Sequence, residues 1–249
     1  MIKWRLMLTT LPMVVIFIGI KLGLQFGTGF GGAIRFADIA IVLTGGIFLI
    51  GFMLAGTMSD YKESEKLPGE IASALEGIRD GLRHIAAGKQ NITEEEINTI
   101  VLDLTNTLHD WLYHKIAATD VQNKITSIAA KLQPLDNTAL GVRVQNELHT
   151  IRKITTRIDV IVRTSFLQSG YALMDSIVAL VLVLLAIAKF DTITSEIVVC
   201  SFVSLIYIYM VRLIRDIDDP FEYEEGKSKG AAEVELFPIE EFKARLEKR

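Results

Sequence analysis

The sequence predicts an all-α integral membrane protein with four membrane-spanning helices and a helical bundle inserted between the second and third. Half of the 249 residues are hydrophobic and the mean hydropathy is +0.37, although 22% of the residues are charged. The apolar residues gather in four stretches of roughly 20 residues, the length that crosses a bilayer core as a helix. The charged region between them shows no β-branched alternation, so we expect helices there as well.

This pattern divides the chain into four parts. Residues 1–58 carry transmembrane helices 1 and 2, and 59–168 form a helical domain. Residues 169–215 form a hairpin of helices 3 and 4, because only a short segment separates the two apolar stretches. Residues 216–249 are a tail.

The first span, Leu6–Leu24, follows Lys3 and Arg5 as a signal peptide would. No small-residue cleavage site comes after it, so we interpret it as a retained helix. We expect Lys21, near its end, to snorkel to the interface. The following segment, 25–35, is rich in glycine and is expected to be a short exposed turn.

Span two, Phe36–Met58, contains several glycines, which allow helices to approach closely in lipid. Span three is Tyr171–Lys189 and span four is Ile197–Ile214. Lysine and arginine near the span ends predict the orientation, because cytosolic loops carry an excess of them. One side collects Lys3, Arg5, Lys62, Lys66, Arg157, Arg163, Arg212 and Arg215, and the other collects Arg35 and Lys189, with Lys21 close by. The N-terminus, the domain 59–168 and the tail are therefore expected to be cytosolic.

Within the charged region, span two is expected to continue as a helix over Ser59–Ala87, bent near Pro68 and ended by Gly88. Thr93 and Glu96 have the spacing of a capping box and predict the start of the next helix.

A shorter helix is expected at about 120–133, ended by Pro134 and the Asp136-Asn137-Thr138 run. A long helix from about 138 to 166 then leads into span three. In the tail, 232–236 is expected to be a strand or an extended segment. The last helix is expected to start at Pro238 and to continue through Glu240–Lys248.

No catalytic or metal site is predicted. The four histidines are His84, His109, His114 and His149. Asp110 and His114 share a helical face, but two ligands without a third do not make a metal site. No phosphate loop, nucleophile elbow or paired cysteine motif is present, so we expect no enzyme. The net charge of −4 gives no indication of nucleic-acid binding.

Acidic residues inside spans are costly and are usually functional or paired. Asp38 and Glu196 lie at the outer ends of their spans and are expected to be interfacial. Asp175 lies one turn inside span three, where it is either an intramembrane functional acid or a residue that reaches water or pairs with Arg163 or Arg212.

Three short motifs resemble the bestrophins. Asp60–Glu70, with Leu67-Pro68, resembles the tract after the second transmembrane helix of that family. Asp219-Pro220-Phe221-Glu222, after span four, resembles its Asn-Pro-Phe-Gly element, and Leu236–Glu240 resembles the tail element that follows. The order of spans, domain and tail also agrees over nearly the whole chain, with the uncharacterised prokaryotic bestrophin-like branch as the nearest relatives.

The resemblance implies a homopentameric channel in the prokaryotic plasma membrane that passes chloride and other small anions. It also implies a hydrophobic neck on transmembrane helix 2 of each subunit. Aligned on Leu67-Pro68, that neck falls near Leu43, Ile47 and Gly51, which are four residues apart. Ile50 and Leu54 continue an adjacent face. A stripe that faces lipid or a neighbouring helix is the alternative interpretation.

Two departures from the family bear on these expectations. The neck of the family is rich in aromatic residues, whereas Gly51 occupies one of its positions here. The calcium-binding members carry consecutive aspartates after the Pro-Phe, whereas this chain has Glu222-Tyr223-Glu224-Glu225. We therefore expect no cofactor, with a calcium site doubtful, and the sign of the permeant ion stays open.

A second class of function also fits the sequence, namely a membrane-anchored signalling or scaffold protein whose helical domain binds a partner. The glycine-rich second span and its continuation into the cytosol favour the channel.

Overall fold

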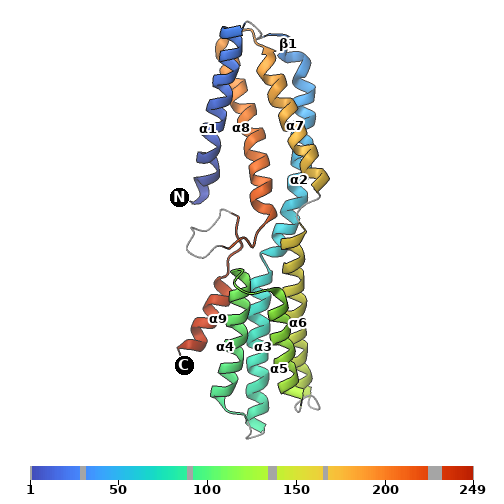
Figure 1. Ribbon diagram of the computed structural model, residues 1–249, viewed down its shortest axis with the longest axis vertical. Helices are drawn as coiled ribbons and strands as arrows, with labels where there is room; N and C mark the ends of the chain where they lie inside the picture. Colours follow the sequence, from blue (N-terminus) through green and yellow to red (C-terminus); the bar gives the residue numbers. More distant parts are fainter. Residues whose placement is uncertain are drawn as a thin grey trace. The chain divides into compact units, whose positions relative to one another are not determined.

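The computed structural model describes residues 2–28, 32–88, 92–133, 139–164, 168–223 and 232–248. Apart from two very short strands, the elements in these ranges are helical (Figure 1). The α-helices are α1 (Ile2–Gly23), α2 (Phe36–Ser64), α3 (Leu67–Gly88), α4 (Glu94–Leu112), α5 (Ala118–Leu132), α6 (Ala139–Arg163), α7 (Gln168–Ile187), α8 (Ile193–Asp218) and α9 (Phe237–Glu247). A π-helix, η1 (Leu24–Thr28), and the strands β1 (Ile34–Arg35) and β2 (Ala188–Lys189) complete the fold.

The chain forms two compact units. The first contains Met1–Tyr61 and Ser165–Asp219, and the second contains Lys62–Thr164 and most of the chain from Pro220 onward. The tail does not stand apart, because α9 belongs to the second unit.

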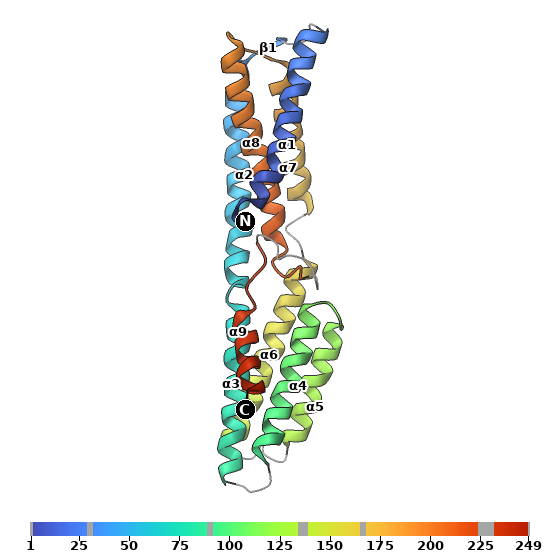
Figure 2. The same ribbon diagram turned by 90° about the vertical axis from the view of Figure 1, so that its left-hand side faces the viewer.

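The first unit holds the helices that are long and apolar enough to cross a membrane. Among the described residues, the candidate spans Trp4–Gly27, Ser169–Ile187 and Ile193–Asp218 lie in this unit. A fourth, Phe36–Gly88, contributes its residues up to Tyr61 to this unit, and the rest of it belongs to the second unit. Helix α1 packs along α8, as Figures 1 and 2 both show. The core of this unit contains Ile39, Leu43 and Ile50 of α2, Met174 and Val181 of α7, and Cys200 and Tyr207 of α8.

The segment expected to be a simple exposed turn, 25–35, contains more structure than that. Its first part is the π-helix η1, and its end is β1, which pairs in parallel with β2. The backbone N–H of Gly32, whose φ is +113°, donates to Ile187 O at 3.2 Å. Glycine adopts this left-handed conformation without strain, which lets the chain reverse there and reach the end of α7.

The second unit is a bundle of α3, α4, α5 and α6 with α9 against α3 and α4 (Figure 2). Its closest pair is α3 and α6, because Gly77 and Gly81 present no side chains where α6 approaches. A Cβ at Gly81 would lie 2.5 Å from Val144 Cγ2, and one at Gly77 would lie 3.1 Å from the Glu147 side chain. The buried face of α4 includes Ile97, Val101, Leu104 and Leu108, which is the apolar stripe expected of an amphipathic helix.

The expected helix boundaries are reproduced closely. Helix α2 ends at Ser64 and α3 begins at Leu67, with Pro68 in its first turn, where a missing N–H has no cost. Thr93 caps α4 through a capping box: Glu96 N donates to Thr93 Oγ1 at 3.2 Å, and Thr93 N donates to Glu96 Oε2 at 2.9 Å. The tail helix begins at Phe237, one residue before the expected start at Pro238.

The remaining expectations concern the ends of helices and the tail. The break at Pro134 and 136–138 lies outside the described residues, as do Glu224 and Glu225. Gly88 is the last residue of α3. The segment 233–236 is not a strand, although Val234 N donates to Pro220 O at 2.9 Å.

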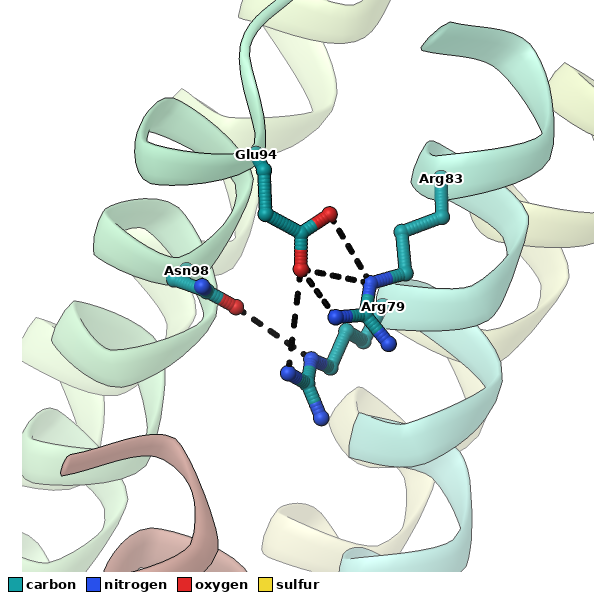
Figure 3. A network of polar contacts seen from close by, with 4 residues as sticks. All are labelled: Arg79, Arg83, Glu94 and Asn98. Carbon is teal, nitrogen blue, oxygen red and sulfur yellow. Dashed lines mark hydrogen bonds and ion pairs between the residues drawn. The ribbon is translucent and has the colours of Figure 1, made fainter. Parts of the chain in front are cut away.

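Two arginines of α3 converge on the first turns of α4 (Figure 3). The Arg83 guanidinium hydrogen-bonds both carboxylate oxygens of Glu94, and Arg79 Nε donates to Asn98 Oδ1 at 3.2 Å. Glu94 thereby raises the pKa of Arg83, chiefly through this hydrogen bonding. The network fixes the corner between α3 and α4 at the end where the intervening residues 89–91 are not described.

Candidate functional site

Helix α2 presents two faces of different character. One stripe is buried at helical spacing and contains Ile39, Leu43, Gly46, Ile50 and Thr57. The opposite side carries large apolar side chains with no cover from this chain: Ile41 is 80% exposed, Phe48 70% and Phe52 75%. In water such a stripe would be unstable, so it must face lipid, another subunit or a pore.

The residues expected to line a neck divide between these two faces. Leu43 and Ile50 are 8% and 1% exposed and belong to the core of the first unit. Ile47 is 40% exposed, whereas Gly51 and Leu54 are half-buried. The five residues therefore do not form one open stripe, and Ile47 is the large apolar side chain among them that is exposed.

A contact from α8 explains why Leu43 is turned inward. Tyr207, which is fully buried, donates its hydroxyl hydrogen to Leu43 O across the two helices. Gly46 makes room for the ring, since a Cβ there would lie 2.6 Å from Tyr207 Oη and 3.1 Å from Ile177 Cγ2. The sequence offered one signal for this contact, a tyrosine in the middle of an apolar span.

Lys21 does not snorkel to an interface. Its side chain is buried, its Nζ lies 3.1 Å from Glu196 Oε1, and it donates to Ala188 O at 2.9 Å and to Ala186 O at 3.3 Å. Glu196, expected at the interface, is 3% exposed. The expectation failed because one carbonyl of α7, one of β2 and a carboxylate offer the ammonium group a complete set of partners inside the protein.

Asp175 forms an ion pair with Arg215 of α8, with Asp175 Oδ2 and Arg215 Nη2 2.7 Å apart and both side chains about half exposed. Its partner is neither Arg163 nor Arg212. Arg212 instead donates to Thr10 Oγ1 at 3.1 Å. Asp38 is paired with Arg35 at 3.0 Å on an exposed surface.

Leu67, Pro68, Pro220 and Phe221 of the family motifs are buried. Leu67 and Pro68 are the first two residues of α3, and both are buried. In the tail, Phe221 is 1% exposed, and Pro220 O accepts the hydrogen bond from Val234. Asp219 is the C-cap residue of α8. The burial of these four residues is typical of side chains that pack the fold.

Among the described residues, no group of three or more histidine, cysteine, aspartate and glutamate side chains is arranged to hold a metal ion. His109 stacks on Tyr113 with the ring centroids 4.5 Å apart. Burial lowers the pKa of His109, and the nearby Lys243 adds to this effect. The calcium expectation stays a prediction, because Glu224 and Glu225 are outside the described residues.

Comparison with known proteins gives no match to a family model and none to a curated protein. Solved structures do match over almost the entire chain. A bacterial bestrophin homologue from Klebsiella pneumoniae is 16% identical with a TM-score of 0.75, covering 100% of this chain and 98% of that one. A variant of that homologue is 14% identical with a TM-score of 0.77, covering 97% and 98%.

The chain has the bestrophin fold. A further structure, described only as that of a membrane protein, is 15% identical with a TM-score of 0.77, and each chain is covered to 97%. Together with the four apolar helices, the bestrophin fold makes this an integral membrane protein. The resemblance found in three short motifs is thus confirmed at the level of the fold.

Proposed function

We propose that this protein is an oligomeric ion channel, a homopentamer in the prokaryotic plasma membrane, with a hydrophobic neck on α2. The observation that carries the proposal is the exposed apolar stripe of α2 in a chain with the bestrophin fold. Rings of aliphatic or aromatic side chains gate channels by dewetting, and they need no charged residue at the constriction. The permeant ions proposed are chloride and other small anions, as the family resemblance implies.

The burial of each side chain reduces the number of residues of α2 that can line the neck. A side chain that lines a pore between subunits must be open in a single subunit. Ile47 meets this condition, and Phe48 and Phe52 meet it more fully. Leu43 and Ile50 occupy the core, so we propose that they support the neck from behind. Gly51 and Leu54 flank the stripe.

The termini and the second unit are proposed to be cytosolic, because lysine and arginine cluster on that side of the spans. A cysteine-labelling experiment with a membrane-impermeant reagent tests this. A cysteine replacing exposed His149 should react only after cells are opened. A cysteine replacing Lys189 should react on intact cells.

The channel proposal is tested with purified protein in detergent and in planar bilayers. Electron microscopy should show a symmetric ring with a central pore, and bilayers should conduct under a KCl gradient. The reversal potential then gives the sign of the permeant ion. A monomer or simple dimer without conductance would contradict the channel and favour the membrane-anchored scaffold.

Two variants locate the neck. Ile47→Ala and Phe48→Ala should change conductance or gating, because each removes apolar volume from the exposed face of α2. Leu43→Ala should instead lower thermal stability by about 2–5 kcal/mol, since it empties a buried position. If Ile47→Ala and Phe48→Ala conduct as wild type does, the neck lies elsewhere.

A further inference from the structure

Tyr207 and Gly46 hold α2 at one defined turn. The Tyr207 side chain is completely buried between α2 and α7, and its hydroxyl bonds Leu43 O. A buried hydroxyl without a partner costs several kcal/mol in an apolar medium, so the tyrosine has one favoured position relative to α2. Gly46 and Leu43 define that position, one by leaving space for the ring and the other by accepting the hydrogen bond.

Comparison with two other glycines of α2 shows that the close approach of Tyr207 is specific to Gly46. An added Cβ at Gly46 would meet Tyr207 Oη at 2.6 Å and Tyr207 Cε1 at 3.3 Å. At Gly45 or Gly51 nothing lies within 4 Å. Of these three glycines, Gly46 alone is required for the approach of α8.

The contact lies directly behind the exposed face of α2. Gly46 precedes Ile47 and Phe48 in the same helical turn, and Leu43 lies one turn before Ile47. A rotation of α2 about its axis would move the exposed side chains sideways, and it would also break the Tyr207 hydrogen bond. The same turn therefore carries the anchor on one side and the candidate neck on the other.

We propose that Tyr207 is a positioning residue that sets the rotation of α2 at the neck and thereby the gating of the channel, with Gly46 as its matching space. This inference rests on the channel function proposed above. Hydrogen bonds between membrane helices are individually weak, so the contact can be exchanged when the pore changes state without unfolding the subunit.

The test uses the full-length protein in planar bilayers. Tyr207→Phe removes only the hydroxyl and should change the ratio of open to closed time roughly two- to threefold. Oligomer size and melting temperature should stay close to wild type. Tyr209→Phe makes the same chemical change two residues along α8 and is the matched control. A merely structural role would lower the melting temperature and leave the open-time ratio unchanged.

A second variant tests the geometry. Gly46→Ala should alter gating more strongly, because its Cβ would strike the tyrosine hydroxyl. The double variant Gly46→Ala/Tyr207→Phe should recover part of that change, since the closest obstacle is gone. Gly45→Ala is the control for thermal stability.

The outcomes separate the two proposals. If wild type does not conduct, the channel function fails and the pore role of this contact fails with it. If wild type conducts while Tyr207→Phe gates like Tyr209→Phe and the double variant shows no recovery, the positioning role alone is overturned.

Discussion

Lys21 and Glu196 form a buried ion pair, with Nζ and Oε1 3.1 Å apart and the side chains only 2% and 4% exposed. The ammonium group also bonds the carbonyl oxygens of Ala186, in the last turn of α7, and of Ala188, in β2, and it lies 5.2 Å from the centre of the Phe190 ring. One side chain of α1 thus joins the end of α7 to the first turn of α8.

Breaking this pair on one side should be strongly destabilising. Lys21→Met leaves Glu196 buried and unpaired, which typically costs about 3–5 kcal/mol. The double variant Lys21→Met/Glu196→Gln removes both charges and should lose much less stability than the two single variants added together. Thermal unfolding in detergent measures the difference. Additive losses would show that the two side chains do not depend on each other.

This pair also shows where sequence reasoning stops. The sequence predicts that Lys21 and Glu196 each lie at an interface, because charged side chains near span ends usually reach water. Their pairing requires the ends of α1, α7 and α8 to meet, and no local pattern encodes that meeting. The contact of Tyr207 with Leu43 is not predictable from a local pattern either, because the two residues are 164 positions apart in the chain.

Features that depend on neighbouring residues are predictable from the sequence. The capping box at Thr93 and Glu96, the proline at the start of α3 and the apolar stripe of α4 each depend on residues within a few turns. The family resemblance predicts the neck near Leu43, Ile47 and Gly51, but it does not show which side of α2 is covered by α7 and α8. Leu43 and Ile47 are four residues apart, and over that distance a helix of 3.6 residues per turn completes one turn and rotates about 40° further. That rotation takes Leu43 into the core and leaves Ile47 at its edge.

Two glycines of α3 should respond in opposite ways to alanine. Gly81→Ala places a Cβ 2.5 Å from Val144 Cγ2, so we expect a loss of about 1–3 kcal/mol from overpacking. Gly69 has nothing within 4 Å and is exposed, so Gly69→Ala should gain up to about 1 kcal/mol of helix propensity. Both are measured by thermal unfolding of the full chain. A gain from Gly81→Ala would mean that α3 and α6 are farther apart than described.

The capping box of α4 gives a further stability prediction. Thr93→Ala removes the acceptor for Glu96 N and should cost about 0.5–2 kcal/mol. Thr99→Ala is the control, because Thr99 is exposed within α4 and its hydroxyl bonds only the Glu95 carbonyl of its own helix. That change should stay within about 0.5 kcal/mol of wild type. Hydrogen exchange at the first turn of α4 should rise in Thr93→Ala and not in Thr99→Ala.

His109 should make the second unit less stable in mild acid. Burial is the main cause that lowers the pKa of His109 from its usual 6.5, with Lys243 and Lys115 adding to it and Asp110 and Glu240 opposing. The unfolded chain therefore takes up a proton at a higher pH than the folded chain does. The contribution of this residue to stability is complete above pH 6.5 and is lost as the pH falls through the lowered pKa of the folded state.

Melting temperatures of wild type and His109→Gln measured from pH 7.5 down to about pH 5 test this expectation. The glutamine side chain cannot take up the proton, so the decline with acid should be shallower in His109→Gln. His149→Gln, at an exposed position of α6, is the matched control and should follow wild type.

Equal slopes for wild type and His109→Gln would assign the acid sensitivity to carboxylates, such as Glu63, whose pKa is lowered by its hydrogen bonds with Arg157. Stability that depends on Glu63 is present above the unfolded pKa of its carboxyl group and is lost as the pH falls through the lower folded value, so the decline would then begin at a more acidic pH.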